Sequence, residues 1–137
     1  MANVESLKGI KILVAEDNEI NVMIISKYFI KWEVDFDIAP NGEKAIEFAK
    51  IKCYDLILSD IHMPVLNGYD ATKAIRKNKD SLNKDIPIYA LSGSIDIEVK
   101  DEIEQSGMNG LIYKPYRPDE LYNTILQILH TAQTIHL

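Results

Sequence analysis

Short apolar runs alternate along the chain with segments in which apolar residues recur every three or four positions. The runs predict strands over five stretches, 10–15, 34–39, 55–59, 86–91 and 111–114. The segments with the helical period predict helices after Asn18 as far as Trp32 and over 43–52, 69–77, 95–106 and 118–131. The polar stretch 77–84 is expected to be the most flexible loop.

Strict alternation of strand and helix is typical of an α/β protein whose sheet is parallel and covered by helices on both faces. Connections this short favour right-handed crossovers. We therefore expect a doubly wound, five-stranded parallel sheet with the strand order 2-1-3-4-5, the flavodoxin-like (βα)5 arrangement. The period-two alternation over 34–39 suits an edge strand. Residues 1–137 are expected to form a single domain with its core over about 8–130.

Composition narrows the possible functions. The net charge is −6 and Lys and Arg form no cluster, which argues against nucleic-acid binding. The single cysteine, Cys53, excludes an intrachain disulfide and favours a reducing compartment. The first residues show no signal-peptide pattern, and no apolar run approaches the roughly 20 residues of a membrane span. We expect a cytoplasmic chain without direct membrane contact.

Carboxylates follow two of the predicted strands. Glu16 and Asp17 come directly after the first strand, and Asp60 comes after the third. These strands are neighbours at the switch point of the predicted sheet, where ligands bind in such folds. Three acids in one crevice repel one another unless a cation is present, and hard oxygen ligands select Mg²⁺ or Mn²⁺. Taken singly, Asp17 could instead be a helix cap and Asp60 a turn residue.

The fourth and fifth strands deliver a hydroxyl and an ammonium group to the same edge of the sheet. Ser92 follows the fourth strand, and Lys114 ends the fifth, just before Pro115. A divalent metal, a nucleophilic carboxylate, a hydroxyl donor and an ammonium together suit phosphoryl transfer, whose catalysis is mostly positioning and charge neutralisation. An Asp nucleophile would form an aspartyl phosphate.

The set of Glu16-Asp17, Asp60 with Met63-Pro64 and Gly68, Ser92, and Lys114-Pro115 resembles the receiver domain of two-component response regulators. The resemblance covers about residues 8–130. The opening of the chain, with Leu7-Lys8-Gly9 and Asn18-Glu19-Ile20-Asn21, is most similar to receivers of hybrid sensor histidine kinases. The chain is therefore expected to be a stand-alone receiver or, in preference, part of a longer hybrid kinase.

The resemblance implies a role for each of these residues in a phosphorelay. Asp60 would accept a phosphoryl group from the phosphohistidine of a histidine kinase or a histidine phosphotransfer protein. Asp17 would bind Mg²⁺ directly, Glu16 would act through water, and the backbone carbonyl of His62 would be a further ligand. Lys114 would contact Asp60 and then the phosphoryl oxygens, Ser92 would close on the phosphoryl group, and the Lys114-Pro115 bond would be cis. The chain would catalyse only its own phosphotransfer and slow autodephosphorylation.

Three positions depart from the commonest receiver pattern. The switch hydroxyl is Ser92 rather than Thr, and Gly93 follows it where Ala is usual. Leu111 stands where the switch aromatic is expected, three residues before Lys114. Tyr113 is expected on the opposite face of its strand from Ile112 and Lys114. The usual coupling of the hydroxyl to an aromatic rotamer is therefore in doubt.

Other functions fit these residues less well. A non-phosphorylated interaction module would not need the intact Asp60, Asp17 and Lys114. A flavodoxin needs a phosphate loop rich in Ser, Thr and Gly after the first strand, where this chain has acids. An Asp-dependent phosphatase needs a second Asp two residues after its nucleophile, where this chain has His62.

Overall fold

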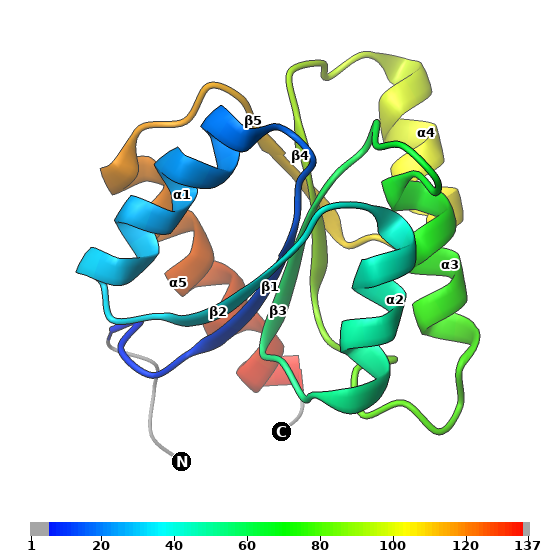
Figure 1. Cartoon of the computed structure of the whole chain (residues 1–137), viewed down its shortest axis with the longest axis horizontal. Helices are drawn as coiled ribbons and strands as arrows, with labels where there is room; N and C mark the ends of the chain where they lie inside the picture. Colours follow the sequence, from blue (N-terminus) through cyan, green and yellow to red (C-terminus); the bar gives the residue numbers. More distant parts are fainter. Residues whose placement is uncertain (1–5, 136–137) are drawn as a thin grey trace.

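The computed structural model describes residues 6–135, which form one parallel sheet with helices on both faces (Figure 1). The strand order is β2-β1-β3-β4-β5, as the alternation predicts. The strands are β1 (Lys11–Ala15), β2 (Asp35–Ala39), β3 (Leu56–Asp60), β4 (Ile88–Ser92) and β5 (Gly110–Tyr113). The helices are α1 (Glu19–Lys31), α2 (Gly42–Ile51), α3 (Gly68–Lys77), α4 (Ile97–Ser106) and α5 (Pro118–Ile135).

The two faces of the sheet carry two separate apolar cores. α1 and α5 cover one face, and α2, α3 and α4 cover the other (Figure 1). The first core includes Phe29 of α1 and Ile125 of α5, and both side chains are fully buried. The second includes Ala45 of α2 and Ile103 of α4. The central strands β1 and β3 are apolar on both faces because each side meets a helix layer.

Polar side chains set the starts of four helices. Asn18, Asn41, Asn67 and Asp96 each accept a hydrogen bond from the backbone N–H three residues later. At α1 the cap is therefore Asn18, and Asp17 is not needed for that purpose. At α4 the cap at Asp96 delays the helix to Ile97, two residues after the predicted start.

Other element ends differ from the sequence expectations by a few residues. β4 begins at Ile88, after Pro87, and extends to Ser92. β5 stops at Tyr113, so Lys114 lies just beyond the strand. Trp32, expected on the buried face of α1, instead follows its last residue and is half-buried, with its ring stacked 5.6 Å from that of Tyr28. The apolar pattern predicted each helix and strand because burial sets the spacing of apolar residues. The ends of the elements depend on local caps, which this pattern does not contain.

The polar loop 77–84 is anchored to the rest of the fold near its end. The Asn83 side chain is fully buried and donates to the carbonyls of Ala49 (2.7 Å) and Lys52 (2.6 Å). Its amide oxygen accepts from the Tyr54 N–H at 2.8 Å. These three bonds fasten the loop to the end of α2 and the start of β3. Part of the polar composition of this stretch therefore serves a buried hydrogen-bonded hub, while Lys79, Asp80 and Leu82 are exposed.

Arg76, near the end of α3, ties three other segments together. Its guanidinium donates to the carbonyls of Lys84 and Ile86 (both 2.7 Å) and of Gly107 (3.0 Å). It also donates to the Asn109 side chain at 2.9 Å. The planar guanidinium group carries several N–H donors in a fixed arrangement, so one Arg side chain can bind several acceptors at once. Arg76 thus fixes the end of α4 and the entry to β4.

Within the described range, none of the helices is long and apolar enough to cross a bilayer.

Candidate functional site

Three carboxylates meet at the carboxyl ends of β1 and β3. Glu16 and Asp17 follow β1, and Asp60 is the last residue of β3. The parallel register pairs Ala15 with Ser59, so the next residue of each strand lies at the same level. One carboxylate oxygen from each acid lies within 4.8 Å of the other two. The structure therefore brings together the three acids that the topology predicted to converge.

These acids differ in their exposure. The side chain of Glu16 is 2% exposed and that of Asp60 is 19% exposed, while Asp17 is open to solvent. Glu16 thus lies beneath the site, Asp60 lies at its floor and Asp17 lies at its rim. An acid at the rim is well placed to bind a soluble ligand.

Lys114 supplies a cation to the group. Its Nζ donates a hydrogen bond to Glu16 Oε1 at 3.0 Å and lies 3.7 Å from Asp60 Oδ1. The peptide bond between Lys114 and Pro115 is cis, as the resemblance implies. The Lys114 N–H also donates to the Ser92 carbonyl at 2.7 Å, which ties the end of β4 to the same corner. Lys114 therefore contacts two acids directly.

The electrostatics of Glu16 and Asp60 differ. Burial opposes ionisation of Glu16, but hydrogen bonds from Lys114 and the Asn18 N–H outweigh it and lower the Glu16 pKa. Burial, together with the nearby charge of Glu16, raises the pKa of Asp60 to about 6, and Lys114 only partly opposes this. At neutral pH the site holds an excess of negative charge, because one ammonium faces three carboxylates.

That charge excess and the oxygen donors fit a hard divalent cation. Mg²⁺ is bound by carboxylates, carbonyls and water, and it favours sites with one or two carboxylates that leave other positions open. The cluster of Glu16, Asp17 and Asp60 supplies such donors at the mouth of the crevice. Because Asn18 caps α1, the alternative use of Asp17 as a helix cap is excluded. The donor set suits Mg²⁺ or Mn²⁺.

Ser92 and His62 border the site without joining the acid cluster. The Ser92 side chain is buried, and its hydroxyl donates to the Ser94 carbonyl (2.7 Å) and accepts from the Ser94 N–H (3.0 Å). Over residues 6–135 no hydrogen bond joins this hydroxyl to Asp60 or Lys114. The His62 side chain is exposed in the loop after β3.

Two contacts at the site were not predicted from the sequence, although Gly68 itself was part of the motif. A Cβ on Gly68 would collide with the carbonyl oxygen of Asp60, so only glycine lets α3 begin this close to the end of β3. Ser94 and Asp96 form hydrogen bonds that continue from Ser92 to the start of α4. An Asp followed by a helical pattern is a cap signal, and it could have indicated the second feature.

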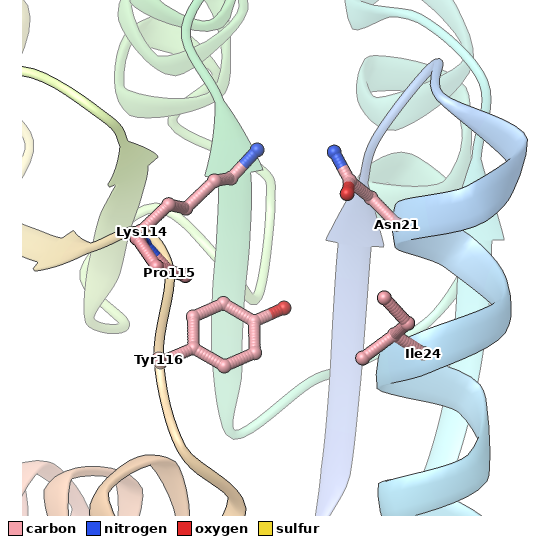
Figure 2. Close-up of a pocket in the computed structure, with 5 residues that line it drawn as sticks. All are labelled: Asn21, Ile24, Lys114, Pro115 and Tyr116. Atoms are coloured by element: carbon pink, nitrogen blue, oxygen red, sulfur yellow. The ribbon is translucent and has the colours of Figure 1, made fainter.

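A groove opens beside Lys114. Its volume is about 330 Å³, and it is lined by Asn21 and Ile24 of α1 and by Lys114, Pro115 and Tyr116 (Figure 2). Figure 2 shows the Lys114 ammonium and the Asn21 amide facing each other across the opening, with the Tyr116 ring opposite Ile24. Ile20, Met23 and Ile30 of α1 are also well exposed, at 67%, 58% and 68%. Ile20, Met23 and Ile30 therefore form an apolar stripe on α1, which begins at the end of the helix that follows Asp17.

Comparison with known proteins places the chain in a family. Residues 12–126 match the model of the response regulator receiver domain, which spans β1 to α5. The chain belongs to the response regulator receiver domain family. The prediction from the acidic, hydroxyl and lysine positions is thereby confirmed.

Relatives of this receiver domain include sensor kinases. It is 34% identical over 119 residues to the autoinducer 2 sensor kinase/phosphatase LuxQ of Vibrio parahaemolyticus. The aligned region covers 87% of this chain and 14% of LuxQ. The chain thus spans about a seventh of the length of that relative.

Solved receiver structures have the same fold. One is the receiver domain of the Pseudomonas aeruginosa sensor histidine kinase PA1611, which holds a magnesium ion in its active-site cleft. The match covers 90% of this chain and 98% of that one, with 32% sequence identity and a TM-score of 0.80. The receiver domain of Saccharomyces cerevisiae Ssk1 was co-crystallised with the histidine phosphotransfer protein Ypd1; the match covers 94% of each chain, at 28% identity and a TM-score of 0.82.

Proposed function

We propose that this receiver domain accepts a phosphoryl group on Asp60 from a phosphohistidine, in the presence of Mg²⁺. The observation that carries the proposal is the Asp60 carboxylate at the floor of an acid cluster, 3.7 Å from the Lys114 ammonium. In the transfer, a bond forms between an Asp60 carboxylate oxygen and phosphorus while the phosphorus–nitrogen bond breaks. The electron pair of the broken bond returns to the imidazole of the donor.

Glu16, Asp17, Asp60 and the backbone carbonyl of His62 would hold the metal. Bound there, Mg²⁺ (or Mn²⁺) would offset the negative charge of the carboxylates and of the phosphoryl oxygens. Asp17 is the exposed member of the cluster and would be a direct ligand, with the buried Glu16 acting through water.

Lys114 and Ser92 would stabilise the product. The Lys114 ammonium now donates to Glu16, and it lies close enough to Asp60 to turn to an oxygen of a phosphoryl group there. The Ser92 hydroxyl lies one residue beyond Leu91, which pairs with Asp60 in the sheet, so it is at the right level to donate to the same group. Its move from Ser94 to the phosphoryl group would signal phosphorylation.

The biological setting follows from this chemistry. The chain would act as a signalling module in the cytoplasm, with residues of about 8–130 as the complete receiver unit. It would catalyse only its own phosphotransfer and a slow loss of its own phosphate. A histidine kinase or a histidine phosphotransfer protein would be the donor, and a longer hybrid kinase would be the natural context.

The groove beside Lys114 and the stripe on α1 would receive the donor. A phosphohistidine must reach Asp60, and the groove opens where Lys114 borders the acid cluster. The exposed Ile20 and Met23 on α1 would bind an apolar surface around that histidine. The Ssk1 receiver shows that a receiver of this fold binds a phosphotransfer protein.

Phosphorylation by phosphoramidate, a small donor with a phosphorus–nitrogen bond, tests the proposal. With Mg²⁺, intact-mass spectrometry is expected to show one added phosphate on the wild-type chain and none after treatment with EDTA. Asp60→Asn should abolish the addition. Asp55→Asn is the matched control, because Asp55 lies just before the other end of β3 and binds the Lys11 N–H. Phosphorylation of Asp60→Asn at the wild-type rate would refute the proposal.

A second pair of rates tests the docking surface. Met23→Glu should slow transfer from phosphorylated Ypd1, used as a probe, at least tenfold more than transfer from phosphoramidate. Equal slowing with both donors would contradict docking on α1. Lys50→Glu on α2, an exposed position on the other side of the sheet, is the control.

A further inference from the structure

A chain of hydrogen bonds runs from the Ser92 hydroxyl to the first turn of α4. Ser92 Oγ donates to the Ser94 carbonyl at 2.7 Å, and the Ser94 N–H donates back to Ser92 Oγ at 3.0 Å. Ser94 Oγ donates to Asp96 Oδ2 at 2.9 Å. The other oxygen, Asp96 Oδ1, accepts the Val99 N–H at 2.9 Å and so caps α4. Only the bond between Ser94 and Asp96 joins two side chains, and the other bonds join a side chain to the backbone.

The Ser92 hydroxyl has a single proton to donate, and Ser94 holds it. If the Ser92 side chain rotates about its Cα–Cβ bond to donate to a phosphoryl group on Asp60, the hydroxyl oxygen moves with the proton. The carbonyl and the N–H of Ser94 then both lose their partner. The loop around Ser94 must therefore rearrange when Ser92 changes partner.

That rearrangement reaches α4 through Asp96. Ser94 Oγ and the Val99 N–H bind the two oxygens of the Asp96 carboxylate, which caps α4. A displacement of Ser94 would therefore move the Asp96 carboxylate and change the cap. Together, the Val99 N–H and the Ser94 hydroxyl hold the pKa of Asp96 below its usual value, so the carboxylate is ionised at neutral pH. A charged cap binds both donors strongly.

The usual route through an aromatic residue on β5 is missing here. Leu111 has no polar group and packs on the core beneath α4, and Tyr113 is 50% exposed. Meanwhile Ile95 and Ile97, beside Asp96, are 54% and 77% exposed. A change at the start of α4 would therefore change an apolar surface that a partner can contact.

We propose that Ser94 and Asp96 relay the state of the Ser92 hydroxyl to the N-terminus of α4. The inference rests on the proposed function, because a phosphoryl group on Asp60 is what would draw Ser92 away. Ser94 is a positioning residue in this scheme, since it acts through Ser92 and Asp96. The output is the position of the first turn of α4 and of Ile95 and Ile97.

Two backbone amides serve as separate reporters in a ¹⁵N NMR titration of the full chain. The Ile61 N–H donates to Asp60 Oδ1 at 2.9 Å, so its signal reports what happens at Asp60. The Val99 N–H reports the cap of α4. Beryllofluoride, a stable analogue of a phosphoryl group on a carboxylate, is added with Mg²⁺ until the Ile61 signal stops changing. In the wild type, both signals are expected to shift.

Variants then break the link between Ser94 and Asp96. Ser94→Ala removes the hydroxyl, and Ser94→Val removes it while keeping the branched shape of threonine. In both, the shift of Val99 at saturation should fall at least threefold relative to that of Ile61. Ser94→Thr, which keeps the hydroxyl, should restore it. Glu98→Gln, an exposed carboxylate on the same turn, is the control and should change neither ratio.

The possible outcomes distinguish a failure of the relay from a failure of the proposed phosphorylation of Asp60. If Val99 shifts as much in Ser94→Ala and Ser94→Val as in the wild type, the relay is wrong while Asp60 remains the acceptor. If Ile61 does not respond in the wild type, Asp60 does not bind the analogue, and both proposals fail. Should Ser94→Ala fold poorly, Ser94→Val decides, because both leave the Asp96 cap of α4 in place.

Discussion

Replacing Asp60 with asparagine is expected to stabilise the fold while abolishing phosphorylation. The Asp60 carboxylate is held against Glu16 in a largely buried position, and its pKa is raised to about 6 from an ordinary value of 3.8. The folded state therefore binds this proton more tightly than the unfolded chain does. The stability that the proton contributes is fully present below pH 3.8 and is lost as the pH rises through 6.

The two pKa values set the size of the effect. Ionising Asp60 costs the folded state about 3 kcal/mol at pH 7 and about 0.5 kcal/mol at pH 4. Asparagine removes the charge but also deprives Lys114 of an ionised partner 3.7 Å away. We expect Asp60→Asn to raise the free energy of unfolding by about 2 kcal/mol at pH 7, or the melting temperature by about 7 °C for a chain of this size.

Urea unfolding followed by circular dichroism at pH 7 and pH 4, without divalent metal, measures this difference. The gain should be large at pH 7 and shrink to a small fraction at pH 4. Asp101→Asn, an exposed carboxylate on α4, is the control and should change stability at neither pH. If Asp60→Asn is no more stable than the wild type at pH 7, burial and the charge of Glu16 do not make ionised Asp60 unfavourable in the folded state.

Three further substitutions test other parts of the structure. Asn83→Ala should lower the free energy of unfolding by about 3 kcal/mol in urea, because it removes three hydrogen bonds that a fully buried side chain makes to the backbone. The exposed Asn123→Ala should have little effect, and equal effects of the two would refute the buried hub. Gly68→Ala should cost about 2 kcal/mol and slow phosphorylation, since its methyl group meets the Asp60 carbonyl. Gly93→Ala, where a methyl group meets no atom within 4 Å, should be neutral for stability, and a neutral Gly68→Ala would contradict the close approach. Leu111→Tyr should alter partner affinity more than the phosphorylation rate with a small donor, and equal effects on both would refute this.

The fold could be predicted because burial leaves a clear pattern in the sequence. β1 from Ile12 and β3 as far as Leu58 are apolar on both faces, since helices cover both, and α3 carries Ala71 and Ile75 at helical spacing. The acid cluster followed in turn from topology, because neighbouring parallel strands end at one edge of the sheet. For these features, local composition and geometry were enough.

Features that depend on partners far along the chain could not be predicted. Asn83 is a polar residue in a polar stretch, and its partners at Ala49 and Lys52 lie more than thirty positions earlier. The orientation of the Ser92 hydroxyl depends on how the next loop folds, although the residue type was recognised. The role of Arg76 likewise appears only when α3, β4 and the end of α4 are in place.

The central claim is that Asp60 itself carries the phosphoryl group. After incubation with phosphoramidate and Mg²⁺, borohydride reduction converts an aspartyl phosphate to homoserine, which tandem mass spectrometry locates in the chain. The account predicts homoserine at position 60 and at no other aspartate, with none formed when Mg²⁺ is removed. Conversion at Asp17 or another acid, or stable phosphate on Ser92 with position 60 unchanged, would contradict it.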